Sequence, residues 1–242
     1  MGDDAPYLDG VADPSPAAYR GATDQARTPI GVLRRLLDGN RRFFSGAPRH
    51  GYDVTQARRR AEHPRPVALV IGCIDSRVPP EAVFDQGFAE LLAVRTAGHV
   101  LDTAGLASVE LAVRKLRVPL IMVLGHESCA AVEYAVDAVH RGEQPRGDLG
   151  RLVDRIAPSV PRDTALSGTQ TYEGAVRGHL AATVAEVRAI PAVADAVARG
   201  ELAVAGVRYG VTYGRAQLVV PPEAAPLGPE QAAPVAPEQA AP

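Results

Sequence analysis

The chain has only two cysteines, and each stands beside other side chains that can do chemistry. Cys73 ends a short apolar run and is followed at once by Asp75 and Arg77. His126 and Cys129 lie three residues apart, where another apolar run ends. Two thiolates and one imidazole form a known catalytic zinc ligand set that leaves the fourth position to water. Thiolates also favour zinc over magnesium or calcium. These residue types therefore indicate a zinc centre with an open position.

The same residues have plainer interpretations. Cysteine is among the most buried residue types, so both cysteines can belong to an ordinary core. Asp75 and Arg77 can be an ion pair that only fixes a loop. Cys73 can also be the nucleophile of a metal-free thiol enzyme, since Arg77 would lower the pKa of its thiol. Charges directly after a buried strand need partners, and this favours a site over a plain core.

Strand-like and helix-like segments alternate along the chain. Apolar runs typical of buried strands lie at 66–73, 89–98, 118–126 and 201–210, and 215–220 can pair with the last of them through a turn at 212–214. Helical patterns occupy 28–46, 103–116, 128–142, 170–190 and 192–199, while 58–62 is polar and either helix or loop. This alternation predicts an α/β fold with a mostly parallel central β-sheet flanked by helices and preceded by an N-terminal helical arm.

Such a sheet can bring the candidate ligands together. The carboxyl ends of parallel strands share one edge, where ligands bind. Cys73 and His126 each end a predicted strand, and Cys129 opens the predicted helix 128–142. A helix N-terminus next to Cys129 would help to hold its thiolate. We therefore expect the three side chains to converge.

Composition and charge narrow the class of protein. The net charge of −2 gives no reason to expect nucleic acid or an anionic membrane as a partner. The first twenty residues lack the apolar stretch of a secretory signal, and no apolar run is long enough to span a bilayer. We expect a cytoplasmic protein, where two cysteines favour metal binding or catalysis over a disulfide.

Three regions are expected along the chain. Residues 1–27 are polar, with glycine and proline, and are expected to form a flexible arm. Residues 28–220 are expected to form a single α/β domain. Residues 221–242 repeat Pro-Glu-Gln-Ala-Ala-Pro, which predicts a disordered tail. The segment 29–45 carries leucines and phenylalanines at helical spacing, and we expect these to be exposed and to pack on a partner chain.

The two motifs carry a family resemblance. Cys-Ile-Asp-Ser-Arg at 73–77, followed by His-Glu-Ser-Cys at 126–129, resembles the β-class carbonic anhydrases. The resemblance runs from about Leu33 to Leu218 and includes LLDGNRRFFSG, AVRTAGHVLD and GVRYGVTYGR. It implies an α/β enzyme that reversibly hydrates carbon dioxide to bicarbonate and a proton. It also implies a homodimer or a dimer of dimers, with the active site near the dimer interface.

The resemblance assigns roles to individual residues. Cys73, His126 and Cys129 would hold one zinc ion per chain, and a zinc-bound hydroxide would attack carbon dioxide. Asp75 and Arg77 would be the Asp–Arg dyad of the family. Asp75 would orient the hydroxide, and Arg77 would keep Asp75 ionised and off the metal. Asp75, if released, would become a fourth zinc ligand in an inactive state.

The sequence departs from the family pattern in several places. Many members carry a glutamine where Pro64 stands and a glycine where Ala130 stands, and Ile74 is larger than the usual small residue. We expect these changes to weaken substrate placement. The inhibitory bicarbonate pocket of some members uses a tryptophan where Val70 stands, and the chain has no tryptophan, so we expect that pocket to be absent.

Further polar residues carry weaker predictions. Arg95 is a charged residue near the end of a predicted strand and would face either the site or an interface. His99 would pass protons to solvent or be held in a loop by hydrogen bonds. The remaining histidines are predicted at the surface; they are His50, His63, His140 and His179.

Three other functions remain open at this point. The same zinc fold can act on another cumulated substrate, such as carbon disulfide or carbonyl sulfide. The chain can also be a catalytically weakened zinc protein, for which Pro64 and Ala130 are the supporting features. A metal-free thiol enzyme built on Cys73 is the third.

Overall fold

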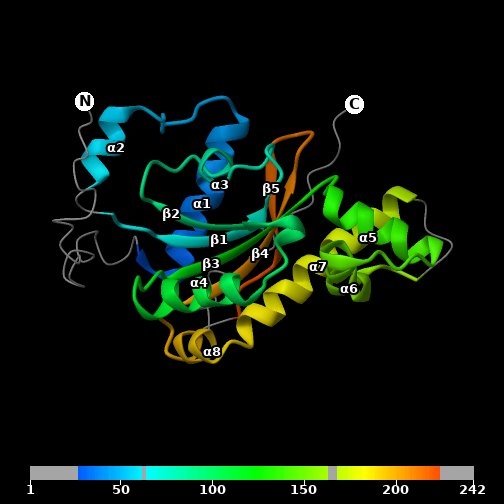
Figure 1. Cartoon of the computed structure of the whole chain (residues 1–242). Helices are drawn as coiled ribbons and strands as arrows, with labels where there is room; N and C mark the ends of the chain where they lie inside the picture. The colour runs from blue at the N-terminus through cyan, green and yellow to red at the C-terminus, as the bar shows by residue number, and fades with distance from the viewer. Residues whose placement is uncertain (1–26, 62–63, 163–167, 224–242) are drawn as a thin grey trace, which may run out of the picture.

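A five-stranded sheet forms the centre of the molecule (Figure 1). The computed structural model describes residues 27–61, 64–162 and 168–223. The strands lie in the order β2-β1-β3-β4-β5. Their bounds are Ala68–Cys73 for β1, Leu91–Thr96 for β2, Leu120–His126 for β3, Ala203–Gly210 for β4 and Arg215–Val220 for β5. The first four are parallel and β5 runs antiparallel to β4. The predicted mostly parallel α/β sheet is confirmed.

The central strands are buried on both faces. Every residue of β1 and β3 is buried, as their unbroken Val, Leu and Ile content predicts for a covered parallel sheet. The predicted hairpin between β4 and β5 is present, and Gly214 in its turn has a φ of 68°. The sequence predicts a second strand that extends to residue 98, but in the structure β2 ends at Thr96. It ends there because Gly98 and His99 adopt positive φ and form a short 3₁₀ turn, η3 (Ala97–His99).

Helices surround the sheet. They are α1 (Pro29–Phe44), α2 (Val54–Ala61), α3 (Pro80–Val83), α4 (Thr103–Arg114), α5 (Ala130–Arg141), α6 (Gly147–Ile156), α7 (Gly168–Arg188) and α8 (Pro191–Ala198), with a 3₁₀ turn η4 (Ala157–Ser159). Helices α3 and α6 were not predicted. Leu149, Val153 and Ile156 of α6 do recur at helical spacing, but the glycines and charged residues between them made the segment look like a loop. Within the described part of the chain, none of these helices has the length and apolarity to cross a membrane.

Two helical layers cover the two faces of the sheet. Helices α1 and α3 cover one face, where Leu36 and Val83 belong to the same apolar cluster as Met122 of β3. Helices α4, α7 and α8 cover the other face, where Val109 and Leu180 belong to a second cluster. Figure 1 shows α1 and α4 on opposite sides of the strands.

Helix α1 follows its sequence closely but packs differently from expectation. Thr28 caps it by accepting a hydrogen bond from the Gly31 backbone N–H at 3.1 Å. Val32, Leu33 and Leu36 are buried in the core of their own chain. The expectation that the leucines of this segment are exposed for a partner chain is therefore wrong for Leu33 and Leu36. Phe44 remains exposed.

The carboxyl ends of the strands have a cover of their own. Helices α5 and α6 lie beyond the ends of β1 and β3 (Figure 1). Val132 and Val136 of α5 and Ile156 of α6 form a third buried cluster that also contains both cysteines.

Most of the predicted arm (1–27) and most of the predicted tail (221–242) lie outside the described residues. The limits of the domain, 28 and 220, stay predictions.

Candidate metal centre

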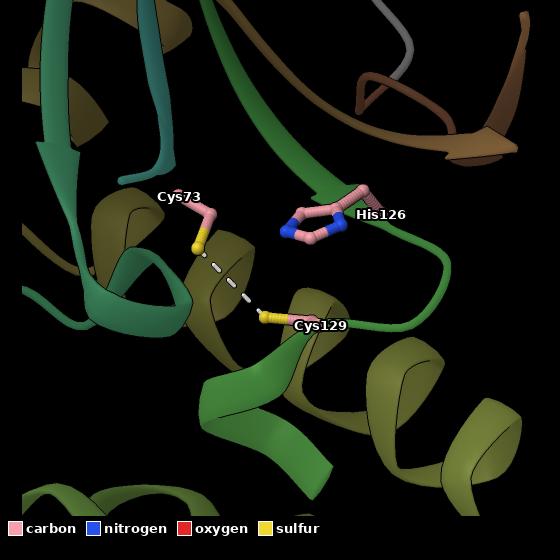
Figure 2. Close-up of side chains that lie close together, drawn as sticks. All are labelled: Cys73, His126 and Cys129. Carbon is pink, nitrogen blue, oxygen red and sulfur yellow. Dashed lines mark hydrogen bonds between the residues drawn. The ribbon is translucent and has the colours of Figure 1, made fainter. Parts of the chain in front are cut away.

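The three candidate ligands converge at the carboxyl edge of the sheet. Cys73 is the last residue of β1, His126 is the last residue of β3, and Cys129 precedes the first turn of α5. Their ligand atoms all lie within 4.8 Å of one another, and all three residues are buried. The two sulfur atoms are 3.8 Å apart, with the His126 ring beside them (Figure 2). The predicted convergence is confirmed.

The His126 ring is oriented for a cation. Its Nδ1 lies 2.8 Å from the carbonyl oxygen of Glu127. A carbonyl only accepts, so Nδ1 carries the proton, and in the neutral ring the lone pair is on Nε2. Nε2 is buried and has no hydrogen-bond partner. Metal-bound histidines typically donate their other ring N–H to such an acceptor. The orphaned nitrogen beside two sulfurs therefore fits a metal ion.

The two thiols also call for a cation. The Cys73 and Cys129 thiols share a hydrogen bond at 3.8 Å, and this lowers the pKa of Cys73 more than burial raises it. The same hydrogen bond, together with burial, raises the pKa of Cys129. Two thiolates at 3.8 Å would repel each other with no cation between them. A divalent ion would stabilise both thiolates at once.

Arg77 holds Asp75 next to this centre. The Arg77 Nε donates to both carboxylate oxygens, at 3.0 and 3.1 Å, and a terminal nitrogen donates to Oδ2 at 2.6 Å. These hydrogen bonds lower the pKa of Asp75 to about 2, so the carboxylate stays ionised. The predicted bidentate pair is present. Among the described residues, the candidate metal cluster comprises the two cysteines and His126 and does not include Asp75.

Arg95 fixes the same loop from the neighbouring strand. Its Nε donates to the carbonyl of Cys73 at 2.8 Å, and a terminal nitrogen donates to the carbonyl of Asp75 at 2.5 Å. The sequence alone did not decide whether Arg95 faces the site or an interface. The structure places it at the site, as a clamp on the backbone that carries Cys73 and Asp75.

The structure decides between the two predictions for His99 and contradicts the one for His179. His99 is 2% exposed, stacks on His179 and lies 3.2 Å from the Thr183 hydroxyl, so it is a loop histidine held by a hydrogen bond and does not reach solvent to release protons. His179 was predicted at the surface but is 4% exposed, because it lies on the side of α7 that packs against the strand ends. His140 is exposed as predicted, His50 is half-buried against Asp85, and His63 lies outside the described residues.

A cavity opens beside the metal centre. Its volume is about 610 Å³. Its polar wall includes Cys73 and Asp75, and its apolar wall includes Ile74, Tyr134 and Leu149. Ala130, which stands where many members of the resembled family have glycine, also lines the cavity. A small apolar substrate can enter here and meet Asp75 next to the buried cysteines.

Sequence reasoning missed several contributions to this site. The carbonyl of Glu127 sets the His126 tautomer, and the carbonyl of Ser128 accepts a hydrogen bond from Arg77 at 2.9 Å. Both are backbone groups, which residue types do not reveal. The position of Ser128 directly before Cys129 was the only hint in the sequence that its backbone lies at the site.

The fold and the site together define a candidate metal centre at the carboxyl edge of a mostly parallel α/β sheet. A family model described as carbonic anhydrase matches residues 68–216. The chain is 43% identical over 194 residues to carbonic anhydrase 2 of Mycobacterium tuberculosis, covering 78% of this chain and 92% of the relative. It is 41% identical to the carbonic anhydrase of Mycolicibacterium smegmatis over 78% of this chain and 93% of the relative.

The solved structures agree with the sequence relatives. The β-carbonic anhydrase of Coccomyxa, solved in complex with acetazolamide, superposes with a TM-score of 0.62 at 26% identity, covering 79% of this chain and 87% of that one. The chain belongs to the β-class carbonic anhydrases. It is therefore an enzyme of the carbonic anhydrase family, as the resemblance of its two motifs implied.

Proposed function

We propose that Cys73, His126 and Cys129 hold one zinc ion and that the enzyme reversibly hydrates carbon dioxide to bicarbonate and a proton at this site. The observation that carries the proposal is the buried Nε2 of His126, which has no hydrogen-bond partner and lies beside two sulfurs. A Cys₂His set is a catalytic zinc ligand set. Zinc bound there would supply a water acidified enough to attack carbon dioxide.

Asp75 and Arg77 are proposed to order the attacking water. Because Arg77 keeps it ionised, Asp75 can accept a hydrogen bond from that water and turn an oxygen lone pair toward carbon dioxide. Arg77 donates hydrogen bonds to both carboxylate oxygens, so the carboxylate is held away from the metal ligands. Ile74, Tyr134 and Leu149 offer apolar surface to a nonpolar substrate.

The assembly and the compartment belong to the same proposal. The exposed fractions of Ile74, Tyr134 and Leu149 are 62%, 39% and 55%. Apolar side chains gathered at the mouth of a site are typical of an interaction surface, and a second copy of the chain in a homodimer or a dimer of dimers would cover them.

The cytoplasm is the proposed compartment, because both cysteines are free thiols.

The other candidate functions differ from this proposal in their substrate or in their need for a metal, so substrate assays and metal analysis can tell them apart. A thiol enzyme needs an accessible sulfur, and Cys73 and Cys129 are 5% and 2% exposed. Zinc-loaded protein assayed in parallel with carbon dioxide, carbonyl sulfide and carbon disulfide separates the remaining readings. Turnover of carbon dioxide supports the proposal, turnover of only a sulfur-containing substrate replaces it, and no turnover means a catalytically weakened protein.

The metal assignment is tested by replacing one ligand. Cys73→Ser is expected to lose zinc and stopped-flow carbon dioxide hydration together, because a hydroxyl is a weaker donor than a thiolate. Ser108→Ala on the exposed side of α4 is the matched control and is expected to keep both. Full zinc occupancy in Cys73→Ser, measured by elemental analysis, would contradict the assignment.

A further inference from the structure

Glu127 belongs to the loop that joins His126 to Cys129, and the reaction described above does not use its side chain (Figure 2). Its carboxylate reaches the turn between β4 and β5, where Oε2 accepts a hydrogen bond from the backbone N–H of Thr212 at 3.2 Å. The backbone N–H of Glu127 donates to the carbonyl of Tyr209 at 2.9 Å. Glu127 is therefore tied to the β4–β5 hairpin both through its backbone and through its side chain.

The backbone carbonyl of Glu127 is the group that orients His126. It lies 2.8 Å from Nδ1 and accepts the proton carried there, which leaves the lone pair of the buried Nε2 for a metal ion. Because the peptide unit is planar, the direction of this carbonyl depends on how the residues on either side of it are held. A shift of Glu127 would therefore turn the imidazole of His126 as well.

The local backbone does not hold this carbonyl by itself. The next residue, Ser128, has a φ of 50°, which residues other than glycine rarely adopt. Such a conformation persists only where the surrounding structure holds it. Arg77 holds one side of the peptide, because it donates to the carbonyl of Ser128 at 2.9 Å. Thr212 and Tyr209 hold the other side through Glu127.

The hairpin is anchored from the core. Asn40 of α1 is 2% exposed, and its side-chain amide donates to the carbonyl of Gly214 at 3.0 Å and accepts from the N–H of Ala216 at 2.8 Å. Gly214 also closes the turn by donating to the carbonyl of Gly210 at 2.8 Å. The turn that offers the Thr212 N–H therefore has a fixed position relative to the sheet.

We infer that Glu127 is a positioning residue for His126, and that its carboxylate, held by the Thr212 N–H, keeps the Glu127 carbonyl directed at Nδ1. The inference rests on the proposed role of His126 as a zinc ligand. The β4–β5 turn thereby supports a ligand that lies on another element. Groups that orient a metal-bound histidine typically change metal affinity by about 10- to 100-fold when they are removed.

Two variants of the full-length chain test the carboxylate. Glu127→Gln keeps an oxygen that can accept from Thr212, whereas Glu127→Met fills similar space without a comparable acceptor. We expect Glu127→Met to bind zinc about 10-fold more weakly, the lower end of the range for groups that support metal ligands. Glu127→Gln should stay within about threefold of the wild type, given the same range. Competition with a chromophoric chelator measures both affinities.

Two controls separate this support from other effects. Thr212→Ala keeps the backbone N–H and should bind zinc like the wild type, because the donor is not the side chain. Glu110→Met makes the same substitution on α4, at an exposed ion pair with Arg114, and should also keep the wild-type affinity. Wild-type affinity in Glu127→Met would overturn the inference. Equal losses in both Glu127 variants would overturn it too, because they would indicate the charge of Glu127 and not its hydrogen bond.

The proton on Nδ1 of His126 reports on the ligand itself. In zinc-loaded protein labelled with ¹⁵N, a ¹H–¹⁵N spectrum of the ring should show this proton in slow exchange with water. Its exchange should be about tenfold faster in Glu127→Met, in step with the affinity, and should return toward the wild-type rate in Glu127→Gln. An unchanged exchange rate in Glu127→Met would refute the inference.

A measurement on the wild type distinguishes this inference from the proposed ligand set. In ¹⁵N-labelled protein loaded with ¹¹³Cd, Nε2 of His126 should show scalar coupling to the metal. Absence of that coupling would refute the proposed ligand set, and the inference with it. Coupling at Nε2 together with wild-type affinity in Glu127→Met would refute the inference alone.

Discussion

Arg77 ties Asp75 to the loop that carries the second cysteine. Its guanidinium donates to both oxygens of Asp75, and one of its terminal nitrogens also donates to the carbonyl of Ser128 at 2.9 Å. Asp75 follows β1, whereas Ser128 precedes Cys129 at the start of α5. The Asp75–Arg77 pair therefore links the two segments that supply the cysteines.

Arg77→Ala is expected to keep zinc and lose carbon dioxide hydration by about 100-fold, in line with the loss of one preorganised hydrogen-bond donor. Asp75, once released, could offer its carboxylate to the metal in place of the water. Arg77→Lys should rescue poorly, because an ammonium lacks the planar fork. Zinc content and stopped-flow rates are measured on the same samples. The control is Arg141→Ala, which removes an exposed ion pair with Asp137. Near-normal turnover of Arg77→Ala with zinc retained would show that Arg77 only fixes the loop as an ion-pair partner.

Arg95→Met should weaken zinc binding by about 10-fold, the lower end of the range for groups that support metal ligands. The reason is that the carbonyls of Cys73 and Asp75 would lose their shared donor and the ligand loop would loosen. Arg114→Met, which removes an exposed pair with Glu110, is the control. Chelator competition gives both affinities. An unchanged affinity in Arg95→Met would show that the backbone of β1 holds Cys73 without the clamp.

Gly39→Ala should destabilise the fold by about 3 kcal/mol, as overpacking in a core does. A Cβ at this position of α1 would lie only 1.8 Å from the carbonyl oxygen of Phe84, which is backbone and cannot rotate away. Gly51→Ala is the matched control, since its new Cβ would lie 3.6 Å from the flexible end of Gln56. Urea unfolding measures both. A change below about 0.5 kcal/mol in Gly39→Ala, the range of neutral surface substitutions, would refute the close approach of α1 to that loop.

Asp85 is expected to make the fold sensitive to acid. Burial alone would raise its pKa, but hydrogen bonds from Arg42 and from the backbone N–H groups of His50 and Arg49 outweigh burial, so the pKa is lowered. A folded-state pKa below the unfolded value gives stability that is present above the unfolded pKa of about 4. That stability is lost as the pH falls through the folded value.

The matching variant is Asp85→Asn. It should lower the free energy of unfolding by about 3 kcal/mol at pH 7, since it leaves Arg42 without its anionic partner. It should also flatten the fall in stability below pH 4, and urea unfolding from pH 3 to pH 7 measures both effects. Asp148→Asn, at a fully exposed ion pair, should change neither. An equally steep acid dependence in Asp85→Asn would assign the acid sensitivity to other carboxylates.

The sequence by itself determined the sheet, its edge and the candidate metal ligands. Unbroken apolar runs mark β1 and β3 because a covered parallel strand has no polar face. Cys73 and His126 end those strands, and the ends of parallel strands meet at one edge. Their convergence could thus be predicted without any knowledge of side-chain packing. Spacing and residue type sufficed to predict the cluster of candidate ligands, and the two motifs sufficed for the family.

The tertiary structure alone decided how these ligands are held. The tautomer of His126 depends on the carbonyl of Glu127, and the fixed direction of the Cys73 loop depends on Arg95 from a neighbouring strand. The burial of His179 depends on which side of α7 meets the strand ends. Each of these relations joins a side chain to a backbone group or face set by packing between separate elements. Residue types along the chain do not encode that packing locally, so only the folded arrangement reveals it.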